Sequence, residues 1–473
     1  MPTIALPGSD VVGSDEWWVR RLSKAIHDRN RGAGWNRASL SNKAGTRPGL
    51  ALLDGWLRSE PPLPVGADEG YVAAWRHFLR TSRTNYAELV VSSRTERIVA
   101  LGWRTGVTDG EDTDGDQVAE ALAVHTDLRN RVSEAVQDMC GLSVGYLMVG
   151  PDEHAVGKAI VTRESPLSTI VASDYAGRPR AGLRMVVDDW TGDHEIWLYR
   201  PADGATEGYQ RVARKSRTGW SWGEPESLPR FPIVEIANYL GVGEFERHLD
   251  VLTRINDTMF TRMVLTKLQA HRQRAIEQEM PKDSDAHKVD LEVDPEDFIS
   301  GPDALWLMPP GTKLWESAQA DLTSVRAMTE DDVKALSATT KTPIWQLLPG
   351  SQNQSATGSE RANEGFLALI EDRRHRVDVA LSKVLSMCFE IMGDRERSDA
   401  AKIRTIWSPV ERYSISEKSQ AFSSMYGKVP FDELVLDVLQ KRPSDLPRLN
   451  AARGRDIFFQ APGGSAVSGV DRA

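Results

Sequence analysis

The chain has 473 residues, of which 40% are hydrophobic and 27% charged, the composition of a globular protein with two or three domains. Its formal net charge of −10 opposes a protein that grips DNA phosphates through a basic surface, although it allows a surface that DNA slides past. Two cysteines, Cys140 and Cys388, are too few for a disulfide framework or a Cys-based zinc site. We expect them to be buried as small hydrophobic residues in a reducing compartment.

The N-terminal third of the chain predicts helices. Residues 1–12 lack the pattern of a secretory signal, and no window of the sequence is apolar enough to predict a membrane-spanning helix. Residues 14–30 predict an amphipathic helix capped by Ser14 or Asp15, and residues 31–48 predict a loop. Residues 71–101 predict two helical pieces that end in a short strand at 102–104.

An acidic stretch at residues 109–116 resembles a calcium loop but fails the EF-hand spacing, because the first and last ligand positions fall on Gly110 and Ala121. We therefore expect a solvated turn there. Residues 117–140 predict one helix with an inward-facing apolar side. The residues on that side are Val118, Leu122, Val132, Val136 and Cys140.

The composition changes after residue 143. Short runs of β-branched and aromatic residues follow, each bounded by Gly, Asp or Pro, which predicts a mainly antiparallel β region over 143–240. The expected strands are 145–149, 159–162, 168–172, 181–187, 194–199 and 209–213.

A helical pattern returns over residues 244–280 and stops at Pro281. The far end of this helix is basic, which indicates either a solvated tip or a contact with another subunit or DNA. Its candidate contact residues are Lys267, His271, Arg272 and Arg274, and Lys341 at the end of the next helix is a further candidate contact along the stem. Residues 282–320 form a polar excursion with an expected strand at 305–308, and residues 321–341 predict a second helix that ends with Lys341 before Pro343.

A long helix is predicted over residues 359–392, after a loop at 350–358 that carries no charge. Thr357 and Glu360 have the spacing of a capping box, and Gly393 is the expected stop. An apolar stripe runs along this helix through Ala362, Phe366, Ile370, Val377, Leu381, Val384, Cys388 and Ile391. Residues 373–376 (Arg-Arg-His-Arg) interrupt the stripe, which indicates either a solvated face or a face against acidic groups of a neighbouring subunit or nucleic acid.

The C-terminal region has a looser texture. It predicts a strand at 403–407, short helices at 416–426, 431–439 and 444–453, and a frayed tail from residue 460.

The sequence contains none of the common catalytic motifs. The sequence has no phosphate-binding glycine loop, no dinucleotide fingerprint, no nucleophile elbow and no His-Glu-x-x-His zinc motif. We therefore expect no enzyme, no cofactor and no metal. The alternative is a Mg²⁺-dependent nuclease-type enzyme built from scattered carboxylates.

Taken in order, residues 14–455 resemble the portal proteins of long-tailed double-stranded-DNA bacteriophages. The resemblance lies in the order of elements and in local phrases. These phrases are Asn85-Tyr-Ala-Glu-Leu-Val-Val91, Gly145-Tyr-Leu-Met-Val-Gly150, Glu164-Ser-Pro166, Thr342-Pro343, Ser359-Glu-Arg-Ala-Asn-Glu364 and Trp407-Ser-Pro409. Residues 52–64 lack the paired tyrosines often found at that place in the family, which puts the contacts of this stretch in doubt.

The resemblance implies an α+β fold with a mixed wing, long stem helices, a small clip and a helical crown, assembled as a ring of about twelve copies at one capsid vertex. Each part of that fold then has a place in this sequence. The ranges are 1–243 for the wing, 244–281 and 321–342 for the stem helices, 282–320 for the clip, 343–358 for the tunnel loop, 359–393 for the helix behind it, and 394–473 for the crown and tail.

The resemblance also implies the partners. Double-stranded DNA would pass through the channel without sequence preference, packaged by the terminase large subunit and later ejected. A head–tail connector, the major capsid protein and the scaffold would bind the ring in the virion, after assembly in the host cytoplasm. The loop residues Gln352, Asn353, Gln354 and Ser355 would face the DNA, because uncharged side chains bind phosphates transiently. An ordinary flexible loop is the alternative for these residues, and another oligomeric head or adaptor protein is the alternative for the chain.

Overall fold

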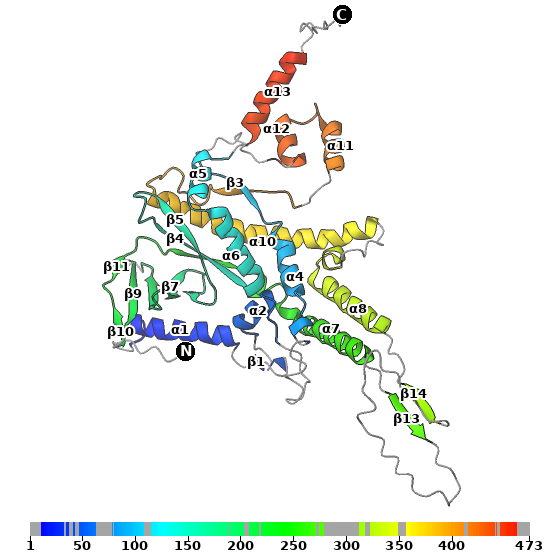
Figure 1. Ribbon diagram of the computed structural model, residues 1–473. Coiled ribbons are helices and arrows are strands. Elements are labelled where there is room, and N and C mark those ends of the chain that lie inside the picture. Colours follow the sequence, from blue (N-terminus) through cyan, green and yellow to red (C-terminus); the bar gives the residue numbers. More distant parts are fainter. Residues whose placement is uncertain are drawn as a thin grey trace, which may run out of the picture.

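The computed structural model describes residues 11–32, 35–36, 41–42, 47–62, 78, 80–107, 115–188, 190–202, 208–216, 219–270, 274–278, 312–316, 322–348, 356–410, 415–439, 441 and 445–460. Helices and antiparallel strands are mixed within it, so the fold is α+β as the sequence predicts. Figure 1 shows a body of sheets and helices from which two helices project as a stalk.

The N-terminal elements are helical apart from a two-stranded ribbon. Helix α1 (Asp15–Arg31) begins at Ser14, whose hydroxyl accepts a hydrogen bond from the Trp17 backbone N–H at 3.2 Å, as the capping pattern predicts. Ribbon β1 (Trp35–Asn36) and β2 (Ser41–Asn42) follows, then helices α2 (Leu50–Leu57) and α4 (Tyr86–Thr95) and strand β3 (Ala100–Arg104).

The helix expected over 117–140 is two helices, α5 (Gln117–His125) and α6 (Leu128–Leu142). The chain turns between them at Asp127, which has a left-handed backbone (φ 52°). Asp116, expected in a solvated turn, is instead buried. Its carboxylate caps α5 by accepting from the Val118 N–H at 2.8 Å, and Arg397 donates to it at 2.8 Å. Residues 109–114 of the acidic stretch lie outside the described residues.

The predicted β region is present and antiparallel throughout its described strands. One sheet has the order β10-β9-β8-β7-β6, with β11 also paired to β9, and a second has the order β12-β4-β5. The bounds are β4 (Val144–Pro151), β5 (Ala159–Glu164), β6 (Thr169–Ser173), β7 (Pro179–Val187), β8 (His194–Arg200), β9 (Tyr209–Ser216), β10 (Gly219–Trp222), β11 (Glu226–Ser227) and β12 (Ile233–Ala237). The last three strands were not predicted.

Alternation along the strands stacks these elements in layers. Helix α1 covers one face of the larger sheet, where Leu22 packs with Leu183 and Leu198. The other face packs on the smaller sheet, because the residues that β4 turns toward it, such as Tyr146, meet Tyr199. The alternate β4 residues, such as Leu147, enter the main core with α6 and α10.

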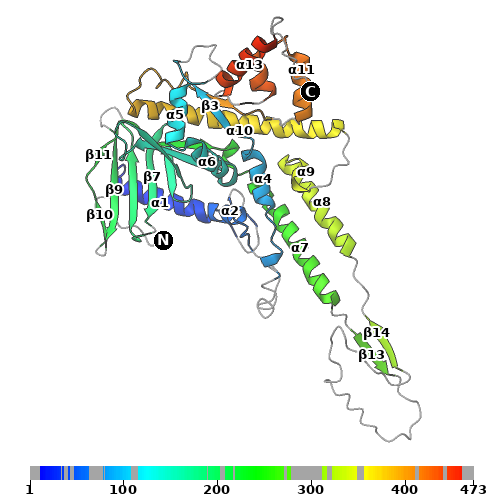
Figure 2. The same ribbon diagram turned by 45° about the horizontal axis from the view of Figure 1, so that its top comes forward.

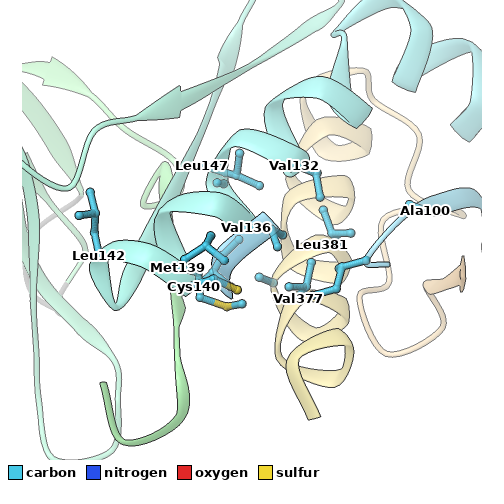
Figure 3. Packing of buried hydrophobic residues seen from close by; sticks show 14 of the residues in the cluster. Ala100, Val132, Val136, Met139, Cys140, Leu142, Leu147, Val377 and Leu381 are labelled. Atoms are coloured by element: carbon cyan, nitrogen blue, oxygen red, sulfur yellow. The ribbon is translucent and has the colours of Figure 1, made fainter. Parts of the chain in front are cut away.

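The main core lies between α6 and α10 (Ala356–Ile391). In Figure 3, Val136 and Cys140 of α6 and Val377 and Leu381 of α10 lie in the same apolar cluster. All four are fully buried, which confirms both the predicted stripe of the long helix and the predicted burial of the cysteines. Helix α10 ends at Ile391, and the predicted stop residue Gly393 follows two positions later with a left-handed φ of 77°. There the Asp394 N–H donates to the Phe389 carbonyl at 2.9 Å.

The stalk consists of α7 (Leu249–Ala270) and α8 (Leu322–Thr340), preceded by short turns η1 (Tyr239–Gly241) and η2 (Glu246–His248). The two helices pack side by side, and strands β13 (Arg274–Gln278) and β14 (Thr312–Glu316) pair at the far end (Figures 1 and 2). The helix predicted to continue to residue 280 therefore ends at Ala270, because the chain becomes a strand four residues later. The expected strand at 305–308 lies outside the described residues.

The start of the long helix also differs from the prediction. Helix α10 begins at Ala356, so Thr357 is inside the helix rather than its cap. A short helix, α9 (Ile344–Leu347), occupies the first part of the predicted tunnel loop. Residues 349–355 of the predicted tunnel loop lie outside the described residues.

The C-terminal elements lie across α10 from the stalk (Figure 2). Strand β15 (Arg404–Trp407) pairs with β3, which brings the end of the chain back to its N-terminal half. Three short helical segments follow, as the proline and glycine pattern predicts. They are α11 (Ile415–Met425), α12 (Phe431–Glu433) continued by η4 (Leu434–Val438), and α13 (Leu446–Gln460).

Candidate functional site

The junction between stalk and body contains a buried ionic cluster. Arg373 of α10 donates from Nε to Glu244 Oε1 at 2.7 Å, and Arg94 Nε of α4 lies 3.3 Å from Glu244 Oε2. The three side chains are 6%, 1% and 7% exposed for Arg373, Arg94 and Glu244. Because Glu244 precedes α7, the cluster joins three helices at the base of the stalk.

Arg94 also binds the end of α8. Its guanidinium donates to the Thr340 carbonyl and, at 3.2 Å, to the Thr342 hydroxyl. The last carbonyls of a helix have no partner within the helix, so a cation there satisfies them and complements the helix dipole. Arg94 of α4 therefore contacts both Glu244, just before the first stalk helix α7, and the C-terminal end of the second stalk helix α8.

The pKa values follow from burial and pairing. Burial lowers the pKa of Arg94, although Glu244 opposes the shift. Burial alone would raise the pKa of Glu244, but Arg94 and Arg373 outweigh it, so the carboxyl pKa lies below its ordinary value. Burial raises the pKa of the adjacent Cys140 thiol, which keeps it protonated.

Residues 373–376, which interrupt the apolar stripe of the long helix, fit neither of the two predictions made for them. Arg373 and Arg374 are buried within the subunit, at 5% and 8% exposure, rather than solvated or facing a partner. Arg374 donates to the Arg97 carbonyl and lies over the Trp407 ring at 5.7 Å. Arg376 pairs with Asp372 on the helix surface, and His375 is exposed.

A rigid turn leads from the β region into the stalk. Buried Asn238 donates from Nδ2 to the Val242 carbonyl at 2.7 Å and to Glu244 Oε1 at 3.1 Å. The turn holds Leu240 in a left-handed conformation (φ 54°) with its side chain 65% exposed. Glu246 then accepts two hydrogen bonds from Arg47, at 2.8 and 2.7 Å.

A pocket of 570 Å³ lies where α8 and α9 meet the first turns of α10. Lys334, Lys341 and Trp345 line it together with Asn363, so it combines two cations with an aromatic ring. Lys341 is exposed and has a left-handed backbone (φ 55°). This pocket borders the turn through which the chain leaves α8.

The predicted contact residues are distributed along the stalk. Lys267 is exposed near the far end of α7, with its ammonium 5.9 Å from the centre of the Phe78 ring. Arg274 lies in β13, opposite Glu316 of β14. Lys341 lies at the other end of the stalk. Four candidate loop residues and two basic ones lie outside the described residues: Gln352, Asn353, Gln354, Ser355, His271 and Arg272.

The charges on the stalk helices nearly cancel. Helix α7 carries three basic and two acidic residues, and α8 carries two basic and three acidic. Arg254 of α7 pairs with Asp332 of α8 at 2.7 Å, and Lys334 pairs with Asp331 at 2.9 Å. The stalk therefore offers a polyanion little net attraction.

The sequence did not reveal Arg94, Glu244 or Thr342 as members of one site. Their separation along the chain exceeds any motif, and each residue type is common on helix surfaces. One signal was present, since arginines inside an apolar stripe need buried partners. The apolar stripe of the long helix could not show which groups elsewhere in the chain bind these arginines.

Within the described ranges, no three His, Cys, Asp or Glu side chains are grouped so as to hold a metal ion. None of the helices described there is long and apolar enough to cross a membrane.

Comparison with known proteins gave structural matches. No protein-family model matches the chain, and no curated protein matches it. A chain from "Neck of native GTA particle computed with C12 symmetry" matches with a TM-score of 0.43 and 14% identity, over 82% of this chain and 99% of that chain. A chain from "Neck of empty GTA particle computed with C6 symmetry" matches with a TM-score of 0.43 and 13% identity, over 82% and 98%. Likeness at this level does not assign a function.

Proposed function

We propose that this chain is the subunit of a portal ring, the channel at one vertex of a phage-type capsid through which double-stranded DNA is packaged and later ejected. In this proposal the chain is structural and catalyses no reaction. A separate terminase supplies the ATP hydrolysis, and head–tail connector proteins attach to the ring in the virion. The order of the described elements supports it. A body of helices and antiparallel strands, helix α7, helix α8, the long helix α10 and short C-terminal helices follow one another along the chain, the order in which the resemblance implies wing, two stem helices, long helix and crown.

The observation that carries the proposal is the uneven burial along the stalk. At the body end, Leu252 and Ile255 of α7 pack with Val333 and Leu336 of α8 in the main core. Farther out, Met259 and Met263 are half-buried, and Met328 is 60% exposed. Two helices bury one stripe each against the other, so the remaining apolar side chains need further helices.

Neighbouring copies in a ring supply such helices. The strand pair at the far end of the stalk also supports a ring, because β13 and β14 pair solely with each other among the described strands. A two-stranded ribbon is at best marginally stable in water and gains from lateral contacts. Side-by-side stalks would cover both the methionines and the ribbons through one heterologous contact repeated around the ring.

The electrostatics of the stalk suit a channel. Cancelling charges on α7 and α8 leave little attraction for the DNA backbone, so DNA can move in either direction without being held. We further propose that residues 352–355 contact DNA without sequence preference. The capsid protein and scaffold would contact the body, and the terminase and later the connector would contact the β13–β14 end.

Negative-stain electron microscopy together with native mass measurement tests the proposal. Rings with a central hole and a mass near twelve times 52.5 kDa, about 630 kDa, would support it. A chain that stays monomeric or dimeric, also when co-expressed with the capsid protein and scaffold, would contradict it. A Mg²⁺-dependent nuclease assay on the same sample tests the enzyme alternative, and we expect no cleavage of linear or circular DNA.

A further inference from the structure

We infer that Arg94 is a positioning residue that clamps the C-terminal end of α8 to the body and so fixes the direction in which the chain leaves the stalk. The inference rests on the proposed function, because there the chain beyond α9 leads to the DNA-facing loop. Arg94 would then decide where that loop begins, although it lies on α4, far away in the sequence.

The buried cluster of Arg94, Arg373 and Glu244 contains two guanidinium groups and one carboxylate. Glu244 already has Arg373 at 2.7 Å and the Asn238 amide at 3.1 Å on the same carboxylate oxygen. Arg373 is also paired with the partly exposed Asp372, so Glu244 is shared between two guanidinium groups, with Arg94 at the longer distance of 3.3 Å. Arg94 brings an additional positive charge into a site that is 1% exposed, and burying such a charge is costly unless other groups bind it.

The groups that bind this additional charge belong to the end of α8. Arg94 donates to the Thr340 carbonyl and to the Thr342 hydroxyl, and Thr342 Oγ1 also lies 2.9 Å from Thr340 Oγ1. The negative end of the α8 dipole lies at these groups. Arg94 therefore acts as a C-terminal cap for α8 that is supplied from another helix.

The turn that Arg94 holds is strained. Lys341, between the two threonines, occupies the left-handed position where glycine is favoured, and the Thr342 N–H closes the turn on the Ser337 carbonyl at 3.0 Å. A non-glycine residue stays in this conformation when its surroundings fix it. The Ser337 hydroxyl donates to the Thr342 carbonyl at 2.6 Å, so the turn is bound from α8 as well as from α4.

The other side of the turn is open. The 570 Å³ pocket lined by Lys341, Trp345 and Asn363 separates the turn from the first turns of α10. Tight packing against α10 therefore does not hold the turn on that side. Hydrogen bonds from Arg94 and Ser337 hold the turn itself, and Leu347 of α9, just beyond it, is buried in the main core.

Hydrogen exchange of Arg94→Met in the full-length chain tests the clamp. Methionine fills the buried space without a charge, and Glu244 keeps Arg373 and Asn238. We expect amides of residues 336–348 to exchange about tenfold faster, because the turn opens locally. Amides of α6 should stay within about twofold of wild type.

Arg374→Met is the matched control. Arg374 is also a buried arginine of this region that donates to a backbone carbonyl, but it binds Arg97 and lies away from α8. It should leave the exchange of residues 336–348 unchanged. The inference would be overturned if the amides of residues 336–348 exchanged equally faster in both variants, or no faster in Arg94→Met, because, of the two arginines, only Arg94 contacts the end of α8.

Thr342→Val provides a second test if Arg94→Met does not fold. It removes the hydroxyl that accepts from Arg94 and keeps the side-chain shape, so residues 336–348 should again exchange faster, by about threefold. Unchanged exchange there would also overturn the inference. Hydrogen exchange is measured on the purified chain whether or not it forms rings, and ring formation is measured separately by microscopy. Failure of the Arg94 inference can therefore be distinguished from failure of the proposed portal function.

Discussion

Arg373 in the middle of α10 donates a hydrogen bond to Glu244 at the base of the stalk. The distance from Nε to Oε1 is 2.7 Å, and both side chains are buried. This pair joins the helix that crosses the body to the helices that leave it. Arg94 of α4 and Asn238 of the turn before α7 contact the same carboxylate, so three separate segments meet at one charged group. A force on the stalk would therefore reach α10 through hydrogen bonds as well as through apolar packing.

Glu244→Gln should destabilise the chain strongly. The amide keeps the size of the side chain but leaves Arg94 buried without a counter-charge and leaves Arg373 with the partly exposed Asp372 alone. Breaking a buried pair in this way costs about 3–5 kcal/mol, which would appear as a lower midpoint in urea unfolding. Glu390→Gln is the control, because its partner Arg230 and Glu390 itself are both nearly half exposed, and it should cost less than about 1 kcal/mol. Equal effects of the two substitutions would refute the role of the cluster.

The stabilisation by Glu244 should depend on pH. The folded-state pKa of this carboxyl lies below its ordinary value of 4.5, so its contribution is complete above about pH 4.5 and is lost as the pH falls through the folded-state pKa. The difference in unfolding midpoint between wild type and Glu244→Gln should therefore be constant from pH 7 to pH 5 and narrow at lower pH. A difference that stays constant down to pH 3 would contradict the assignment.

Lys341→Gly should stabilise the chain. A left-handed backbone costs an L-residue about 1–2 kcal/mol, and glycine removes that cost at the expense of about 0.5–1 kcal/mol of unfolded-chain entropy. Thermal unfolding should show a net gain of up to about 1 kcal/mol. Ser59→Gly is a matched control, because Ser59 is also exposed and left-handed, with φ 60°. Loss of stability in Lys341→Gly but not in Ser59→Gly would mean that the lysine side chain makes contacts that outweigh the strain.

The two thiols should be inert in the native chain. Cys140 and Cys388 are fully buried, and burial raises the pKa of Cys388 to about 12. Because the thiolate is the reactive species, a disulfide reagent at pH 8 should label neither cysteine in native protein and both in guanidinium chloride. Rapid labelling before unfolding would show that the core between α6 and α10 opens readily.

Replacement of Gln352, Asn353 and Gln354 together by alanine tests the proposed loop function. We expect rings to assemble normally, while DNA packaging or DNA retention in particles falls, because transient hydrogen bonds to phosphates are lost. The control replaces three serines of α11, Ser419, Ser423 and Ser424, by alanine and should leave packaging unchanged. Normal packaging and retention in the loop variant would remove these residues from the DNA contact.

The local patterns of the sequence predicted most elements. The apolar stripe from Phe366 to Cys388 and the stop at Gly393 gave the long helix, because both signals lie within the helix itself. Boundaries that depend on distant contacts were less accurate. The first stalk helix ends at Ala270 because β13 pairs with β14, some forty residues later, and no feature between residues 244 and 280 indicates that partner.

The sequence by itself determined the fold class, the first six strands of the β region, the burial of the cysteines and the long helix, since each follows from periodicity or composition over a short stretch of chain. Only the tertiary structure decided that Arg373 and Arg374 are buried and that Arg94 joins Glu244 to the end of α8. The physical reason is that burying a guanidinium requires acceptors. Here those acceptors come from segments up to about 250 positions away, so their meeting depends on how the helices pack.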